Sequence, residues 1–176
     1  YYPGAQRMTL KLLFRPSDGL LLGAQGVGGA GVDRRIDVIA MAIQKRGTIH
    51  DLEEAELCYA PQFGGAKDPV NFAGMVAADV ARGDMPVAHW DEPATEGTLI
   101  LDVRGPGEFA AGHAEGALNI PLETLRSRLH EIPADREVRA YCAVGVRGYI
   151  ATRILMQHGF RARNISGGWA SHPRPA

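Results

Sequence analysis

The sequence predicts an α/β protein in which an α+β unit is followed by a parallel-sheet α/β unit, and three observations support this. In the first half, two strand-like runs flank a turn and are followed by helical patterns. In the second half, short apolar strand runs alternate with helical periodicity, which is typical of a parallel sheet covered by helices. Between them, residues 85–93 contain two prolines and predict a short, stiff connection. We therefore expect one domain over residues 1–90 and another over residues 91–176.

The first domain is expected to open with an antiparallel hairpin. Apolar residues alternate over residues 8–14, turn-forming residues occupy 15–19, and an apolar run returns over 20–27. The glycines of residues 26–31 fit the spacing of a dinucleotide-binding loop. That motif needs a parallel strand–helix–strand unit, whereas this strand pairs backward and the next helix leads into another helix. A glycine-rich strand-to-helix turn is the better interpretation.

Three helices are expected after the hairpin. One runs from residue 32 to near residue 47, one spans residues 48–56, and one spans residues 69–82. Thr48 and Asp51 fit a capping box for the second of these helices. The buried face of the third helix is expected to consist of Phe72, Val76 and Val80.

The second domain is expected to alternate strands and helices. Its strand patterns cover residues 98–104, 137–141 and 161–165, with a further short strand at the end of a loop over 112–121. Helical patterns are expected at residues 122–129 and after the loop that follows residue 142. In such sheets ligands bind beyond the carboxyl ends of the strands.

The chemistry is expected at Cys142, which ends one of these strands and precedes a small-residue loop and a helix. The amides of such a loop and the helix dipole stabilise negative charge, which favours the nucleophilic thiolate. Gly145 and Gly148 allow the loop a positive φ, and Arg147 adds a positive charge. The alternative is a buried structural cysteine, which the glycines and the arginine disfavour. The expected substrate loop consists of Ala143, Val144, Gly145, Val146 and Arg147.

Three other residues are expected to support this site. Asp102 and Arg104 fall at the same sheet edge, with an ordinary strand-end ion pair as the alternative interpretation. His113 is expected to fix its loop by hydrogen bonds, because an amide-stabilised thiolate needs no separate base. Three further histidines of this domain show no metal-ligand spacing, so no metal site is expected.

Composition and charge exclude several classes of function. The formal net charge is −1, and acidic and basic residues balance in each half, so no nucleic-acid or membrane partner is expected. No apolar run approaches the roughly 18 residues of a membrane span, and no signal-peptide pattern is present. Two cysteines, Cys58 and Cys142, form no disulfide framework, which predicts a cytoplasmic protein. The chain begins without an initiator methionine, and we expect it to be a piece of a longer polypeptide.

Four segments of the first half carry a family resemblance: residues 2–4, 21–25, 31–37 and 59–71. They resemble the C-terminal dimerisation domain of the pyridine nucleotide–disulfide oxidoreductases, most closely the coenzyme A-disulfide reductase branch. The resemblance covers nearly all of residues 1–88 and implies a homodimer formed through residues 1–90. It also implies that Tyr59 lies near a coenzyme A thiol site, with a packed interface aromatic as the alternative.

The same resemblance defines what this chain lacks. The FAD- and NAD(P)H-binding domains of that family, with their redox cysteine, have no counterpart in the sequence. No cofactor is therefore expected to bind this chain alone. FAD, NAD(P)H and coenzyme A are implied for the intact protein.

The second half carries another resemblance, in residues 102–104, 108–109, 112–113, 116–121, 140–149 and 167–169. These motifs occur in the order found in the rhodanese domain and span about residues 92–172. The resemblance implies that Cys142 carries a transferable sulfur as a persulfide. Many single-domain rhodaneses place a polar or basic residue after the cysteine, whereas the loop here is apolar. A persulfide or polysulfide donor is therefore more compatible with this rim than thiosulfate, which is a dianion.

A related class of cysteine phosphatases is the main competing enzyme class. Its loop places five residues between cysteine and arginine, whereas four intervene here, from Ala143 to Val146. A shorter loop makes a tighter cradle, which suits one sulfur atom rather than a tetrahedral phosphate. This count argues against phosphoryl transfer.

The expected function is sulfane sulfur transfer through Cys142, with thiol or persulfide small molecules as partners. The intact protein then resembles an FAD- and NAD(P)H-dependent coenzyme A-disulfide, persulfide or polysulfide reductase. The alternative is a catalytically quiet dimerisation and docking module. Thiol reactivity discriminates the two, because an amide-cradled thiolate reacts quickly at neutral pH and a docking module does not.

Overall fold

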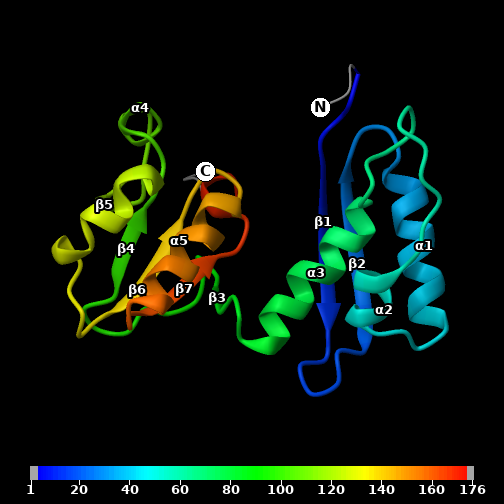
Figure 1. Cartoon of the computed structure of the whole chain (residues 1–176), viewed down its shortest axis with the longest axis horizontal. Helices are drawn as coiled ribbons and strands as arrows, with labels where there is room; N and C mark the ends of the chain where they lie inside the picture. Colours follow the sequence, from blue (N-terminus) through cyan, green and yellow to red (C-terminus); the bar gives the residue numbers. More distant parts are fainter. Residues whose placement is uncertain (1–3, 174–176) are drawn as a thin grey trace. The chain divides into compact units, whose positions relative to one another are not determined.

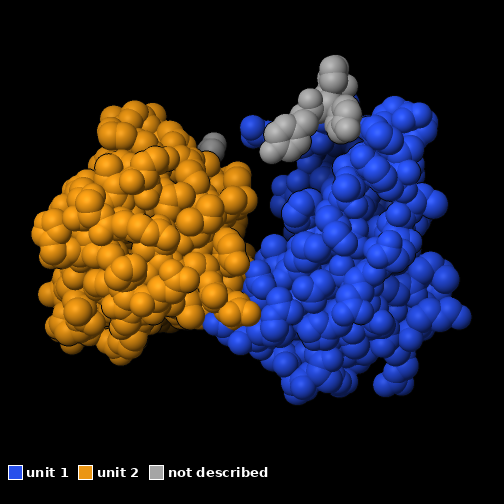
Figure 2. All heavy atoms as spheres, viewed as in Figure 1, with its two compact units in different colours: residues 1–83 blue, residues 84–176 orange. Residues whose placement is uncertain are grey.

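The computed structural model describes residues 4–173 and separates into two compact units, residues 1–83 and residues 84–176 (Figure 2). Both units mix helices with strands, and the second contains a parallel sheet, so the predicted α/β fold class is confirmed. Residues 2 and 3, which belong to the first segment of the oxidoreductase resemblance, lie outside the described residues.

The first unit consists of an antiparallel hairpin and three helices, as expected (Figure 1). Its elements are β1 (Met8–Phe14), β2 (Leu21–Gly28), α1 (Val32–Gln44), α2 (Ile49–Glu54) and α3 (Pro69–Arg82). β1 alternates half-buried with exposed positions, as a strand with one face on a core does. Helix α1 packs on β2, and α3 packs on β1 and α2. Helix α2 carries the predicted capping box but ends short of the expected residue 56.

The glycine-rich segment between β2 and α1 is a strand-to-helix turn, as predicted. A Cβ on Gly26 would lie 2.7 Å from Cγ1 of Val32, so α1 packs directly on the strand backbone there. Gly31 caps α1 with a φ of 84°, in the left-handed region that favours glycine. Strand β2 pairs antiparallel with β1, and α1 leads into α2. The described residues of this unit therefore form no strand–helix–strand unit that binds a dinucleotide.

The predicted buried face of α3 is wrong. Phe72 and Val76 are 57% and 52% exposed, and Val80 is only partly buried. The buried positions are instead Val70, Asn71, Gly74, Ala77 and Ala78. A Cβ on Gly74 would lie 2.3 Å from the backbone nitrogen of Glu53, so the small residues of α3 form its contact with α2. Phe72 and Val76 lie on the exposed side, which is why apolar periodicity selects the wrong face.

The second unit is built on a five-stranded parallel sheet with the strand order β3-β7-β6-β4-β5 (Figure 1). Its strands are β3 (Val87–Ala88), β4 (Leu99–Asp102), β5 (Leu118–Asn119), β6 (Glu137–Tyr141) and β7 (Arg161–Ile165). Its helices are α4 (Pro106–Ala110) and α5 (Val146–Gln157), with 3₁₀ turns η1 (Leu122–Ser127), η2 (Leu129–Glu131) and η3 (Gly168–Ser171). The expected strands are confirmed. The helix expected over residues 122–129 is a pair of 3₁₀ turns, and the sequence patterns did not indicate α4.

Residues 85–93, expected as a connection, take part in the second unit. Val87 and Ala88 pair with β7 as the edge strand β3. Met85 and Ala88 are buried, and Nε1 of Trp90 donates a hydrogen bond to the carbonyl of Gly168. A two-residue strand between prolines is too short to show alternation, so periodicity does not reveal it.

The core of the second unit positions the ends of its central strands. Strand β6 lies between β4 and β7, and all but its first residue are buried. In the register of β4 and β6, Asp102 pairs with Tyr141, and Cys142 follows directly. Because the strands are parallel, these residues meet at the carboxyl edge of the sheet, where ligands bind in such folds.

Candidate active site

Cys142 lies at the centre of that edge, between the end of β6 and the start of α5. Its side chain is 1% exposed and packs within the apolar core of the unit. The backbone N–H of Gly145 donates a hydrogen bond to Sγ of Cys142 over 3.1 Å. Gly145 has a φ of 129°, so the loop makes this contact in a conformation that side-chain-bearing residues rarely adopt.

The turn at η3 holds two carbonyls of the loop. The N–H of Trp169 donates to the carbonyl of Cys142 over 2.7 Å, and the N–H of Ala170 donates to that of Ala143 over 3.0 Å. In a trans peptide the C=O and N–H groups point in opposite directions. The N–H groups of Ala143 and Val144 therefore point away from η3.

Gly168 allows this close approach of η3 to the loop. Its φ is 56°, and a Cβ there would lie 2.4 Å from the carbonyl oxygen of Cys142 and 3.0 Å from the nitrogen of Val144. Any side chain at this position would displace the loop. The close contact with the backbone of the Cys142 loop therefore explains why residue 168 is a glycine.

The first turn of α5 completes the loop. The carbonyl of Gly145 accepts from the N–H of Tyr149 over 2.8 Å and from Nδ2 of Asn164 over 3.3 Å. Val146 and Arg147 begin the helix, where backbone N–H groups have no partner within the helix. These amides and the helix dipole favour negative charge next to the sulfur.

Arg147 forms an ion pair that sequence reasoning missed. Its Nη1 and Nη2 donate to the two carboxylate oxygens of Glu108, on α4, over 2.7 Å and 2.8 Å. The guanidinium holds the pKa of Glu108 at about 2, and Glu108 in turn is the main cause of a raised pKa of Arg147, with Cys142 a smaller cause. The positive charge that Arg147 was expected to add beside the loop is therefore paired with the negative charge of Glu108. Glu108 precedes Arg147 by 39 residues, so no local spacing reveals the pair.

Asp102 and Arg104 form a buried ion pair beside the loop. Nε and Nη2 of Arg104 donate to the carboxylate of Asp102 over 3.0 Å and 2.6 Å, and both side chains are almost fully buried. Nη2 also donates to the carbonyl of Gly112 over 2.7 Å. The guanidinium lies over the rings of Tyr141 and Trp169, 5.4 Å and 5.0 Å from their centroids. Arg104 thereby joins β4, β6, the Gly112 loop and η3.

His113 lies on the exposed surface of the Gly112 loop. Its Nδ1 is 2.9 Å from the carbonyl oxygen of Phe109, and its ring stacks on the ring of Phe109 at 3.7 Å. Both contacts tie the loop to α4.

The rim of the Cys142 loop is apolar. Val144 and Val146 are 61% and 67% exposed, and Ile150 is exposed one turn further along α5. These side chains add no charge to the rim, and the guanidinium of Arg147 is paired with Glu108.

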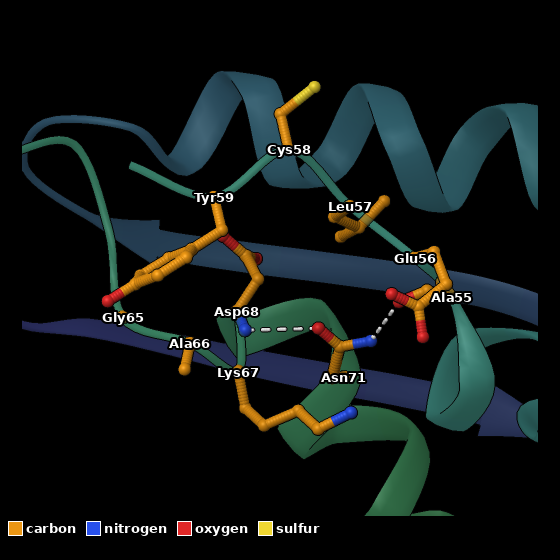
Figure 3. Close-up of a pocket in the computed structure, with 10 residues that line it drawn as sticks. All are labelled: Ala55, Glu56, Leu57, Cys58, Tyr59, Gly65, Ala66, Lys67, Asp68 and Asn71. Atoms are coloured by element: carbon orange, nitrogen blue, oxygen red, sulfur yellow. Dashed lines mark hydrogen bonds between the residues drawn. The ribbon is translucent and has the colours of Figure 1, made fainter. Parts of the chain in front are cut away.

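Tyr59 belongs to the first unit. Tyr59 is exposed and lines a small pocket formed by residues before and at the start of α3 (Figure 3). The remaining lining residues are Ala55, Glu56, Leu57, Cys58, Gly65, Ala66, Lys67, Asp68 and Asn71. Asn71 braces this segment, since its Nδ2 donates to the carbonyl of Ala55 and its Oδ1 accepts from the N–H of Asp68. The side chain of Cys58 points away from the Tyr59 ring (Figure 3).

Within residues 4–173, no group of three or more His, Cys, Asp or Glu side chains is arranged to hold a metal ion. None of the helices in that range is both long and apolar enough to cross a membrane. Cys58 and Cys142 are both free thiols.

Comparisons with known proteins match each half of the chain to a family. Residues 86–172 match the rhodanese-like domain, and residues 1–68 match the pyridine nucleotide-disulphide oxidoreductase dimerisation domain. A sulfurtransferase of Allochromatium vinosum is 44% identical over 85 residues, which are 46% of this chain and 79% of that protein. A coenzyme A disulfide reductase of Staphylococcus haemolyticus is 44% identical over 80 residues, 46% of this chain and 18% of that protein.

Two solved structures resemble nearly the whole chain. Reduced CoADR-RHD of Bacillus anthracis has 42% sequence identity and a TM-score of 0.92, covering 96% of this chain and 31% of that one. An NAD-dependent persulfide reductase from A. fulgidus has 39% identity and a TM-score of 0.85, covering 97% and 31%. The chain thus spans about a third of the length of these two proteins and about a fifth of that of the reductase it matches. It belongs to the rhodanese-like family and carries, before that domain, the dimerisation domain of the pyridine nucleotide-disulphide oxidoreductases.

Proposed function

We propose that this chain transfers sulfane sulfur through a persulfide on Cys142. The Cys142 thiolate attacks the outer sulfur of a persulfide or polysulfide, a new S–S bond forms, and the donor leaves as its thiolate. An acceptor thiolate then attacks the outer sulfur on Cys142 and restores the Cys142 thiolate. Each exchange breaks one S–S bond and forms another, so no external oxidant or reductant is needed.

The observation that carries this proposal is the Gly145 N–H donated to Sγ of Cys142 at the start of α5. A persulfide bears its negative charge on the outer sulfur, and we infer that the N–H groups of residues 143–147 stabilise it. The loop carbonyls held by η3 support this, because their N–H groups then point away from that turn. The orientation of these N–H groups supports an anion cradle on the side of the loop away from η3.

The surroundings of the loop favour a donor of low charge density. Arg147 is paired with Glu108, and Val144 and Val146 form an exposed apolar rim. We therefore propose a persulfide or polysulfide as the natural donor in preference to thiosulfate. We assign Asp102, Arg104 and His113 to the support of the site, since they brace η3 and the Gly112 loop.

For the intact protein we propose a flavin-dependent coenzyme A-disulfide, persulfide or polysulfide reductase. The named activities of the Staphylococcus reductase and of the A. fulgidus persulfide reductase support this assignment. FAD and NAD(P)H would supply the electrons, and other domains of the intact protein would bind these two cofactors. We propose homodimerisation through residues 1–90, with coenzyme A or a redox cysteine as acceptor and Tyr59 near the coenzyme A thiol. Two free cysteines are consistent with a cytoplasmic protein.

A sulfur-transfer assay with matched cysteine variants tests the proposal. The chain is given polysulfide as donor and a thiol as acceptor, and the rate at which the acceptor persulfide forms is measured. Cys142→Ser is expected to reduce the rate to that of the uncatalysed exchange. Cys58→Ser removes an exposed cysteine of the first unit and is expected to leave the rate unchanged. Full activity in Cys142→Ser would overturn the proposal. A wild-type rate no faster than the uncatalysed exchange would overturn it as well and would favour a docking module.

A further inference from the structure

Asn164 is a buried polar residue whose place in the sheet has no explanation in packing alone. It lies on β7, next to β6, and is 4% exposed. Its neighbours in chain and sheet, such as Ala140 and Ile165, belong to apolar clusters. An amide at such a position needs hydrogen-bond partners, because burying a polar group without them is unfavourable.

The partners of Asn164 only partly satisfy it. Nδ2 donates to the carbonyl of Gly145 over 3.3 Å and to Sδ of Met85 over 3.5 Å. Oδ1 is buried and has no hydrogen-bond partner among the described residues. A leucine has a similar branched shape and would leave no side-chain polar atom unpaired here, so stability alone does not favour asparagine.

The amide instead contacts both glycines around the start of α5. Besides its bond to Gly145, its Oδ1 would lie 2.3 Å from a Cβ on Gly148, so the first helical turn rests directly on this side chain. Gly145 donates its own N–H to Sγ of Cys142. One residue therefore separates Asn164 from the sulfur, and that residue is a glycine with a φ of 129° and open space where a Cβ would lie. Its carbonyl is held by the N–H of Tyr149 and by Nδ2 of Asn164.

We propose that Asn164 is a positioning residue that holds Gly145 so that its N–H faces the sulfur of Cys142. The inference rests on the proposed function, in which that sulfur is the nucleophile and the carrier. An apolar residue here would leave no amide oxygen buried and unpaired, and the role of the Asn164 amide is to orient the loop. Thr152 offers a matched comparison. It is equally buried in α5, and its Oγ1 also has no partner among the described residues, but no loop residue depends on it.

The test compares Asn164→Leu with Thr152→Val, both in a Cys58→Ser background so that Cys142 is the one cysteine that reacts. The alkylation rate of Cys142 is measured across pH, beside the sulfur-transfer rate and the unfolding midpoint in urea. In Asn164→Leu we expect alkylation at neutral pH to slow about tenfold, about 1.4 kcal/mol. We also expect its pH–rate midpoint to move to higher pH and its unfolding midpoint to stay or rise. Thr152→Val is expected to keep the wild-type pH–rate profile.

An Asn164→Leu protein that is folded and reacts with the wild-type rate and midpoint would overturn the inference. If Asn164→Leu does not fold, Asn164→Ala removes the same amide without adding volume and is expected to show the same slowing; wild-type reactivity in it would likewise overturn the inference. The alkylation rate measures the reactivity of the Cys142 thiol and does not depend on whether that thiol acts as a sulfur carrier. A slowed Asn164→Leu in a protein that takes up no sulfur would therefore overturn the proposed function and support the positioning role.

Discussion

Replacing Arg104 by methionine is expected to destabilise the second unit strongly. The substitution keeps much of the side-chain volume but removes the guanidinium from the carboxylate of Asp102, which is 0% exposed. The N–H of residue 104 and the hydroxyl of Tyr141 remain as uncharged partners. Breaking a buried ion pair in this way costs about 3–5 kcal/mol. With a urea m-value of about 1.5 kcal/mol/M for a unit of this size, the midpoint falls by about 2–3 M.

Tryptophan fluorescence measures this change in the second unit alone, because both tryptophans of the chain, Trp90 and Trp169, lie there. Arg104→Met and Asp102→Leu are each compared with the wild type and with the double variant. Replacing both charges by apolar groups leaves no buried charge uncompensated. We therefore expect the double variant to be more stable than the sum of the single effects predicts, by about 2 kcal/mol or more.

Two results would refute this reasoning. A cost of less than about 1 kcal/mol for Arg104→Met is the value of an exposed pair and would mean that the pair is solvated. Additivity of the two substitutions within about 0.5 kcal/mol would mean that the two charges do not interact.

Three further predictions concern the two units. Glu108 has a folded pKa of about 2 against an ordinary value of 4.5, so its ion pair stabilises the protein above about pH 4.5 and is lost as the pH falls towards 2. Since the side chains of Glu108 and Arg147 are both partly exposed, Glu108→Gln is expected to lower the free energy of unfolding in urea by less than about 1 kcal/mol at pH 7. The difference between the variant and the wild type is expected to vanish near pH 2, and a difference that does not change with pH would contradict the low pKa of Glu108. Gly168→Ala is expected to destabilise the second unit by at least about 1–2 kcal/mol, because its φ is 56°, and to slow alkylation of Cys142; unchanged alkylation would exclude the contact. In the first unit, Gly74→Ala is expected to lower the unfolding midpoint followed by far-UV circular dichroism, despite the better helix propensity of alanine. Phe72→Ala is expected to change that midpoint little. The opposite result would mean that α3 buries the face predicted from periodicity.

The sequence was sufficient to predict the parts of this protein that depend on local pattern. Alternation identifies β1, turn residues identify the hairpin, and the cysteine loop reads as a strand end followed by a helix start. The capping box of Thr48 and Asp51 places the start of α2, because it needs only residues three apart.

Long-range contacts account for what the sequence did not reveal. The face of α3 is selected by Gly74, which fits against the backbone of α2, and not by Phe72, which is larger and more apolar. The partner of Arg147 lies on α4, and the carbonyls of the cysteine loop are held by η3. A buried asparagine in β7 was a visible signal, since a polar residue in a central strand needs a reason, but its contact with Gly145 depends on the fold.

The central claim is that Cys142 carries a transferable sulfur, and intact-mass spectrometry tests it most directly. The Cys58→Ser chain and the double variant Cys58→Ser, Cys142→Ala are incubated with polysulfide or with thiosulfate, and the intact mass of each chain is then measured. We predict a gain of one sulfur atom that appears faster with polysulfide, is reversed by a thiol, and is absent without Cys142. No added sulfur from either donor, or the same gain in the chain that lacks Cys142, would contradict the account.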